Sequence, residues 1–301
     1  MDGHRVVPLL DESALLGLGT VVDARGLIPA DARGPLIEIL VGYATAARRL
    51  GAERIAFVGT EPLRRAADAR AVVVAVEGAT GVPLHVVDHG EEGLLTLLGA
   101  TSGRAVQAEL LVVDIGGGST QLVLVGPARR ASATGLGTGS ARLAQVHVAH
   151  DPPTRSEITA LRAAASAALR AAPGAAPAEI VIVGGTASNL VKIIPGALHD
   201  RILTPERLGA AFETLCAAPA ADVAARFAIR PQRARILAAG AALLEAILAR
   251  YGAPRATASE EGIREGTVLA LARAGAAWRD RLEALAHGWG ADGAAAMDAE
   301  R

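Results

Sequence analysis

The chain has 301 residues, of which 51% are hydrophobic and 2% aromatic, and its formal net charge is −1. This balance argues against a nucleic-acid-binding surface, a stacking platform for single strands or attraction to anionic membranes. With one cysteine, Cys216, no secretory pattern at the N-terminus and no uncharged apolar run of about 18 residues, we expect a cytoplasmic protein without an intramolecular disulfide, a cysteine zinc cluster or a membrane partner.

The first hundred residues alternate between helical and strand patterns. Helical spacing of apolar residues predicts helices at 31–50 and 62–80, and residues 91–100 form the start of a third helix. Short buried strands are predicted between them, at 54–58 and 83–87. Such an alternation indicates a mostly parallel sheet covered by helices on both faces.

Two apolar, β-branched segments, residues 110–115 and 121–125, follow a polar stretch at 101–109. Five residues of glycine, serine and threonine separate them, so a β-hairpin is predicted here. The turn offers backbone N–H groups and hydroxyls to an anion from Gly116, Gly117, Gly118, Ser119 and Thr120. Asp114, directly before the turn, is placed to hold a divalent cation. The alternative is a glycine-rich β-turn with an incidental aspartate.

Beyond the hairpin, the pattern predicts a helix at 155–171, a buried strand at 180–183 and helices from Thr204 onward. The strand ends in GGTASN at 184–189, which opens a helix. Its glycines allow close approach of a ligand, and the N-terminus of a helix favours negative charge. Neither glycine turn fits a P-loop or a dinucleotide-binding fingerprint. The tail after about Gly288 is low in complexity, so we expect disorder there.

Six sequence blocks follow one another in a defined order. They are GTEPLRRA at 59–66, HGEEGLLTLLGA at 89–100, VVDIGGGSTQLVLV at 112–125, GSARL at 139–143 followed by DPPT, GGTASNL at 184–190 and SEEGIREG at 259–266. Together they resemble the exopolyphosphatase and guanosine pentaphosphate phosphohydrolase family of the actin-like superfamily. The resemblance covers nearly the whole chain.

The resemblance implies an α/β fold with two ribonuclease H-like domains and the active site in the cleft between them. The expected domains are residues 1–105 and 106–287, with the last helix of the second able to pack back on the first, and a tail at 288–301. The family normally opens with another phosphate-binding hairpin, and this chain has none ahead of its first helix, so we expect an incomplete first domain. The sequence leaves open whether the chain forms a homodimer.

The implied reaction is the hydrolysis of a terminal phosphoanhydride of polyphosphate or guanosine pentaphosphate, assisted by Mg²⁺ or another divalent cation. Glu92 would act on the attacking water, with Glu91 as the fallback, and Asp114 and Gln121 would hold the metal. The implied phosphate-binding residues are Arg64, Gly116, Gly117, Gly118, Ser119, Thr120, Gly184, Gly185 and Thr186. Arg64 would clamp phosphate through its bidentate fork.

Several residues keep a second interpretation. Glu91 and Glu92 also fit a solvated first turn of a helix. Arg142 and Arg264 suit phosphate binding and an interdomain salt bridge equally, and His89 suits a cleft and a loop equally. Gln121 stands where the exopolyphosphatases usually carry a glutamate, which weakens the expected metal site. With the absent hairpin, it motivates a rival function, a catalytically weak protein that binds phosphate or an alarmone; a kinase of the same superfamily is the second rival.

Overall fold

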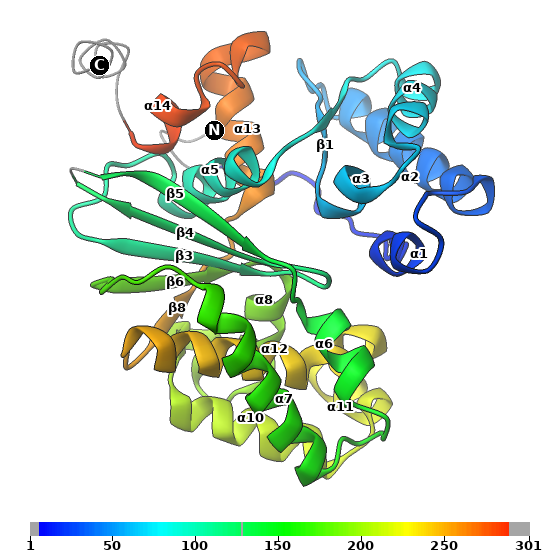
Figure 1. Ribbon diagram of the computed structural model, residues 1–301. Helices are drawn as coiled ribbons and strands as arrows, with labels where there is room; N and C mark the ends of the chain where they lie inside the picture. The colour runs from blue at the N-terminus through cyan, green and yellow to red at the C-terminus, as the bar shows by residue number, and fades with distance from the viewer. Residues whose placement is uncertain (1–5, 128, 289–301) are drawn as a thin grey trace.

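The strands of the chain form two sheets in a computed structural model that describes residues 6–127 and 129–288 (Figure 1). Strands β1 (Phe57–Gly59) and β2 (Leu84–Val86) pair in parallel as a small sheet. The larger sheet has the order β5-β4-β3-β6-β8-β7. Its strands are β3 (Leu110–Ile115), β4 (Thr120–Gly126), β5 (Arg129–Leu136), β6 (Glu179–Val183), β7 (Ile202–Leu203) and β8 (Ala256–Ala258).

Four helices pack with the small sheet. They are α1 (Leu18–Arg25), α2 (Ala30–Arg49), α3 (Glu61–Arg65) and α4 (Ala69–Thr80). The helix predicted at 31–50 is confirmed, but the single helix predicted at 62–80 is wrong. It breaks because Ala66 is extended and Asp68 accepts hydrogen bonds from the Ile28 N–H, at 2.9 Å, and the Arg33 guanidinium, at 2.6 Å. This long-range pairing stabilises a bend that the local sequence does not encode.

The predicted hairpin is confirmed, since β3 and β4 pair antiparallel with Asp114 opposite Gln121. The parallel pairing predicted for the first hundred residues holds for β1 and β2, whereas the larger sheet is mixed. Only the β3–β6 and β6–β8 pairs are parallel, whereas β4, β5 and β7 run antiparallel to their neighbours. Strand β5 was not expected because its half-exposed RRASATGL sequence lacks large apolar residues. Strand β8 lies in a region predicted to be helical.

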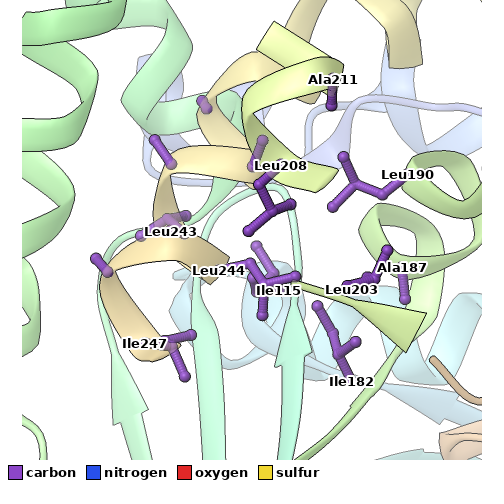
Figure 2. Packing of buried hydrophobic residues seen from close by; sticks show 14 of the residues in the cluster. Ile115, Ile182, Ala187, Leu190, Leu203, Leu208, Ala211, Leu243, Leu244 and Ile247 are labelled. Atoms are coloured by element: carbon purple, nitrogen blue, oxygen red, sulfur yellow. The ribbon is translucent and has the colours of Figure 1, made fainter. Parts of the chain in front are cut away.

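Helices cover both faces of the larger sheet. Along β3, Leu111, Val113 and Ile115 belong to one buried cluster and Leu110 and Val112 to another, as expected for side chains that alternate between faces. Figure 2 shows the first cluster, in which Ile115 and Ile182 of the sheet pack against helices. Those helices are α7 (Arg155–Ala168), α8 (Gly184–Ile193), α10 (Pro205–Ala217), α11 (Ala220–Phe227) and α12 (Pro231–Tyr251), with α6 (Ser140–His147) and α9 (Ala197–Asp200) beside them.

The opposite face is covered by α5 (His89–Thr101), α13 (Ile263–Ala274) and α14 (Leu282–Ala286). Helices α5 and α13 approach each other backbone to backbone. A Cβ atom on Gly99 would lie 1.9 Å from the Gly262 carbonyl oxygen, and one on Gly266 would lie 1.8 Å from the Leu95 carbonyl oxygen. This close packing holds α5, which carries both glutamates of the EE pair, firmly against the sheet.

No helix in residues 6–127 and 129–288 is long and apolar enough to cross a bilayer. The disordered tail predicted at 288–301 lies outside the described residues, apart from Gly288.

Candidate functional site

The two glycine turns predicted from the sequence lie side by side at one edge of the larger sheet. Asp114 of β3 is opposite Val183 of β6, so the turn after β3 and the start of α8 are neighbours. Gly184 has φ +81°, and a Cβ atom on it would lie 2.5 Å from Asp114 Oδ1. The Thr186 hydroxyl donates to the Ile115 carbonyl oxygen at 2.7 Å. Both turns can therefore contact the same ligand.

The first turn keeps free donors. The Gly116 N–H bonds the Ser119 carbonyl oxygen at 2.9 Å and closes the turn. Within the described parts of the chain, no hydrogen bond is found for the N–H groups of Gly117, Gly118 and Ser119. At the second turn, the first N–H groups of α8 have no partner within the helix. Such clustered N–H groups bind anions, and phosphate is the anion that such nests commonly hold.

Glu92 lies buried in the first turn of α5, 8% exposed, so the alternative of a solvated EE pair is wrong for this residue. Its Oε2 atom accepts a 2.6 Å hydrogen bond from Arg64 Nη1. Glu91 has a different role. It closes a capping box with Asp88 and receives two hydrogen bonds from Arg279, which hold the pKa of Glu91 below its usual range. Glu92 is the better placed of the two to act on a ligand.

Arg64 is directed at Glu92 and α5. Its Nη1 atom also donates to the Val87 carbonyl oxygen at 2.8 Å, and Nη2 lies 3.1 Å from His89 Nδ1. His89 lies 3.0 Å from Gln121 Nε2 as well. Of the two interpretations of His89, the loop is wrong, because His89 is the first residue of α5 and its side chain connects Arg64 to Gln121.

Asp114 and Gln121 face each other across the β3–β4 pair, with side chains on the same side of the sheet. Burial raises the pKa of Asp114 to about 7, with the nearby Glu92 carboxylate as the second cause, and Arg233 opposes the rise. Gln121 is 2% exposed, and within the described residues its buried Oε1 atom has no hydrogen-bond partner. A half-buried carboxylate and an unpaired, buried amide oxygen on the same side of the sheet suit a hard cation.

These oxygens fit Mg²⁺ better than a metal that needs a full set of protein ligands. In the described residues, no three His, Cys, Asp or Glu side chains gather as ligands. Mg²⁺ commonly binds one or two protein oxygens and completes its coordination with substrate phosphates and water. The amide of Gln121 carries no charge, so the site has one anionic ligand fewer than a pair of carboxylates would supply.

Arg233 of α12 is a candidate site residue that the sequence did not single out. It lines a small pocket with Ser140, Gly185, Thr186 and Asn189. A Cβ atom on Gly185 would lie 3.4 Å from Arg233 Cζ. Among the described residues, the guanidinium has no hydrogen bond or ion pair. Only its position beside the second glycine turn distinguishes it, because the chain has 30 basic residues and no local pattern marks this one.

Arg142 and Arg264, which the sequence left undecided, both form ion pairs. Arg142 bonds the carboxylates of Asp23 and Glu61 and the carbonyl oxygens of Gly118, at 2.8 Å, and Gly137, at 2.7 Å. It thus ties α6 and the first glycine turn to α1 and α3. Arg264 pairs with Asp11 on an exposed surface. Both side chains therefore form ion pairs, and the choice between phosphate binding and an interdomain salt bridge stays open.

Comparisons with known proteins agree over most of the chain. A model of the Ppx/GppA phosphatase family matches residues 1–274. Exopolyphosphatase 2 of Mycobacterium tuberculosis is 28% identical over 282 residues, which are 87% of this chain and 88% of that protein. Exopolyphosphatase 1 of Mycobacterium leprae is 25% identical over 284 residues, which are 89% of this chain and 82% of that protein.

Solved structures give the same picture. The crystal structure of the Aquifex aeolicus member of the Ppx/GppA family superposes with a TM-score of 0.74 and 26% identity over 88% of this chain and 89% of that one. An exopolyphosphatase structure from Cytophaga hutchinsonii has a TM-score of 0.76 at 20% identity, over 87% of this chain and 89% of that one, and it supports the mixed α/β fold alone.

Proposed function

Because this chain belongs to the Ppx/GppA phosphatase family, as its sequence resemblance predicted, we propose that it hydrolyses the terminal phosphoanhydride of inorganic polyphosphate. The observation that carries the proposal is Glu92, a buried carboxylate that Arg64 holds through a 2.6 Å hydrogen bond to Oε2. Relatives that match this chain over most of their length carry the names of exopolyphosphatases, which disfavours a protein that only binds phosphate.

In this proposal, Glu92 orients the attacking water and accepts its proton. The hydrogen bond from Arg64 fixes the direction of the Glu92 carboxylate. The free N–H groups of Gly117, Gly118 and Ser119 receive the oxygens of the phosphoryl group. Arg233 approaches from the second turn and offsets the negative charge that the phosphoryl group carries.

Asp114 and Gln121 would hold Mg²⁺ in the same cleft, and the cation would supply positive charge that draws electrons from the transferring phosphoryl group. In this arrangement Glu92, whose Oε2 atom accepts a hydrogen bond from Arg64, acts on the water and does not bind the cation. Deprotonation of Asp114 precedes metal binding, since the neutral carboxyl is a poor ligand.

The test is the release of phosphate from long-chain polyphosphate in the presence of Mg²⁺, with Glu92→Gln and Glu91→Gln as a matched pair of neighbours. Loss of the base is expected to lower kcat by about 10² to 10⁴-fold in Glu92→Gln. Glu91→Gln weakens a helix cap and leaves most of the turnover. Equal rates for the unmodified chain and Glu92→Gln, with both folded, would contradict the proposal.

Guanosine pentaphosphate is the second substrate to assay, because it ends in the same type of phosphoanhydride. The two ribonuclease H-like domains and the boundary between residues 105 and 106 also belong to this proposal. The cytoplasmic location stays a prediction from the sequence, and the oligomeric state stays open.

A further inference from the structure

An acidic side chain lies against the first glycine turn. Glu61 begins α3, and a Cβ atom on Gly118 would lie 3.2 Å from Glu61 Oε2 and 3.4 Å from its Cδ atom. The residue is buried, with 11% of its side chain exposed. A carboxylate therefore lies beside the N–H groups that we assign to phosphate.

Two arginines hold this carboxylate through one of its oxygens. Arg65 Nη1 bonds Glu61 Oε1 at 2.5 Å, and Arg142 Nη2 bonds the same atom at 3.3 Å. Within the described residues, no hydrogen bond is found for Oε2, which is the oxygen directed at Gly118. This oxygen is the part of the carboxylate that lies beside the turn, where another anion would meet the same two arginines.

The arginines differ in how they are anchored. Arg142 is fixed to the turn itself through the carbonyl oxygens of Gly118 and Gly137. Arg65 is 39% exposed, and its guanidinium bonds only the carboxylates of Glu61 and Asp23. Guanidinium groups bind carboxylate and phosphate with the same planar fork, so either anion satisfies them.

We propose that Glu61 is an internal competitor for the anionic substrate. In the free protein its carboxylate covers the first glycine turn. A phosphate chain displaces it and gains Arg65 and Arg142 as a second anion subsite, beyond the phosphate held by the turn. The inference rests on the proposed function for the identity of the ligand as a chain of phosphates, but it requires binding only and no turnover.

The test is the affinity for inorganic tripolyphosphate, measured by titration calorimetry with Mg²⁺, in a Glu92→Gln background that suppresses turnover. Glu61→Gln is compared with Glu38→Gln, which makes the same charge change at an exposed residue of α2. If Glu61 covers the turn in about nine molecules of ten, its removal strengthens binding about tenfold. Glu38→Gln leaves the affinity unchanged.

Two further variants separate displacement from a general change in charge. Glu61→Asp keeps the charge and withdraws it from Gly118, so an intermediate gain is expected. Adding Arg65→Gln to Glu61→Gln removes one cation of the subsite and reverses most of the gain. The inference is overturned if folded Glu61→Gln and Glu61→Asp bind tripolyphosphate no more tightly than Glu38→Gln. Phosphate release by the unmodified chain is measured separately, so a failure of the proposed hydrolysis is distinguished from a failure of this inference.

Discussion

Arg64 and Arg65 are consecutive residues of α3, yet each forms an ion pair with a different glutamate. Arg64 bonds Glu92 of α5 in a pair whose side chains are 15% and 11% exposed. Arg65 bonds Glu61 of its own helix and Asp23 of α1, and it is 39% exposed. Successive residues of a helix are directed about 100° apart, so neighbours in sequence meet different surroundings.

The two arginines show that identical side chains differ in function when they differ in burial. Arg64 also bonds the Val87 carbonyl oxygen, so it belongs to the folded framework that holds Glu92. Within the described residues, the Arg65 guanidinium bonds only the carboxylates of Glu61 and Asp23, and its own side chain is exposed, so an incoming anion can replace those partners. An ion pair with an exposed arginine is screened by solvent and contributes less stability than a pair in which both side chains are buried. The first pair is suited to positioning and the second to exchange.

The largest expected effect breaks the buried pair. Arg64→Met leaves Glu92 buried without its cation, and we expect a loss of about 4 kcal/mol of unfolding free energy. Arg65→Met, its matched neighbour, is expected to lose less than about 1 kcal/mol. Urea denaturation of the two variants at pH 8 measures the contrast. Equal losses would show that the distinction drawn from burial is wrong.

A somewhat smaller effect tests the contact between α5 and α13, which holds the helix that carries Glu92. Gly99→Ala forces a Cβ atom against the Gly262 carbonyl oxygen and separates α5 from α13, at a cost of about 3 kcal/mol. Gly78→Ala in α4 meets no atom within 4 Å, and it is expected to stabilise the protein slightly through helix propensity. Thermal unfolding distinguishes them. A tolerated Gly99→Ala would mean that Glu92 does not depend on this close helix contact.

The last effect depends on pH and concerns the charge next to Glu92. Because burial raises the pKa of Asp114 from 3.8 to about 7, the folded state binds this proton more tightly than the unfolded state does. Stability is therefore lost as the pH rises between about 4 and 7, and the penalty is complete above that range. Asp114→Asn removes the penalty.

We accordingly expect Asp114→Asn to melt a few degrees above the unmodified chain at pH 8, in a chelating buffer, with little difference near pH 4. An equal shift at both pH values would indicate a change in packing and not in charge. Asp23 provides the contrast with Asp114. Burial acts to raise the pKa of Asp23 as well, but Arg65 and Arg142 lower it below its usual value.

Local sequence was sufficient for the elements that depend on nearby residues. The β-branched segments around GGGST specify the hairpin, and Thr204 with Pro205 specifies the start of α10, where the Thr204 hydroxyl oxygen accepts the Arg207 N–H. It was insufficient where a distant partner decides. Asp68 bends the helix predicted at 62–80 because it binds Ile28 and Arg33. Strand β8 forms because it adds to the edge of β6.

The candidate site divides in the same way. The two glycine turns, Asp114 and the Glu91–Glu92 pair could be predicted from the sequence alone. A run of small residues at the end of a strand sets the backbone donors of each turn locally. The packing of the helices was needed to show that Glu92 is buried and bonded by Arg64, and that Arg233 and Glu61 approach the glycines. These depend on residues that are far apart in the chain and meet only when the helices pack on the sheets, so no local pattern marks them.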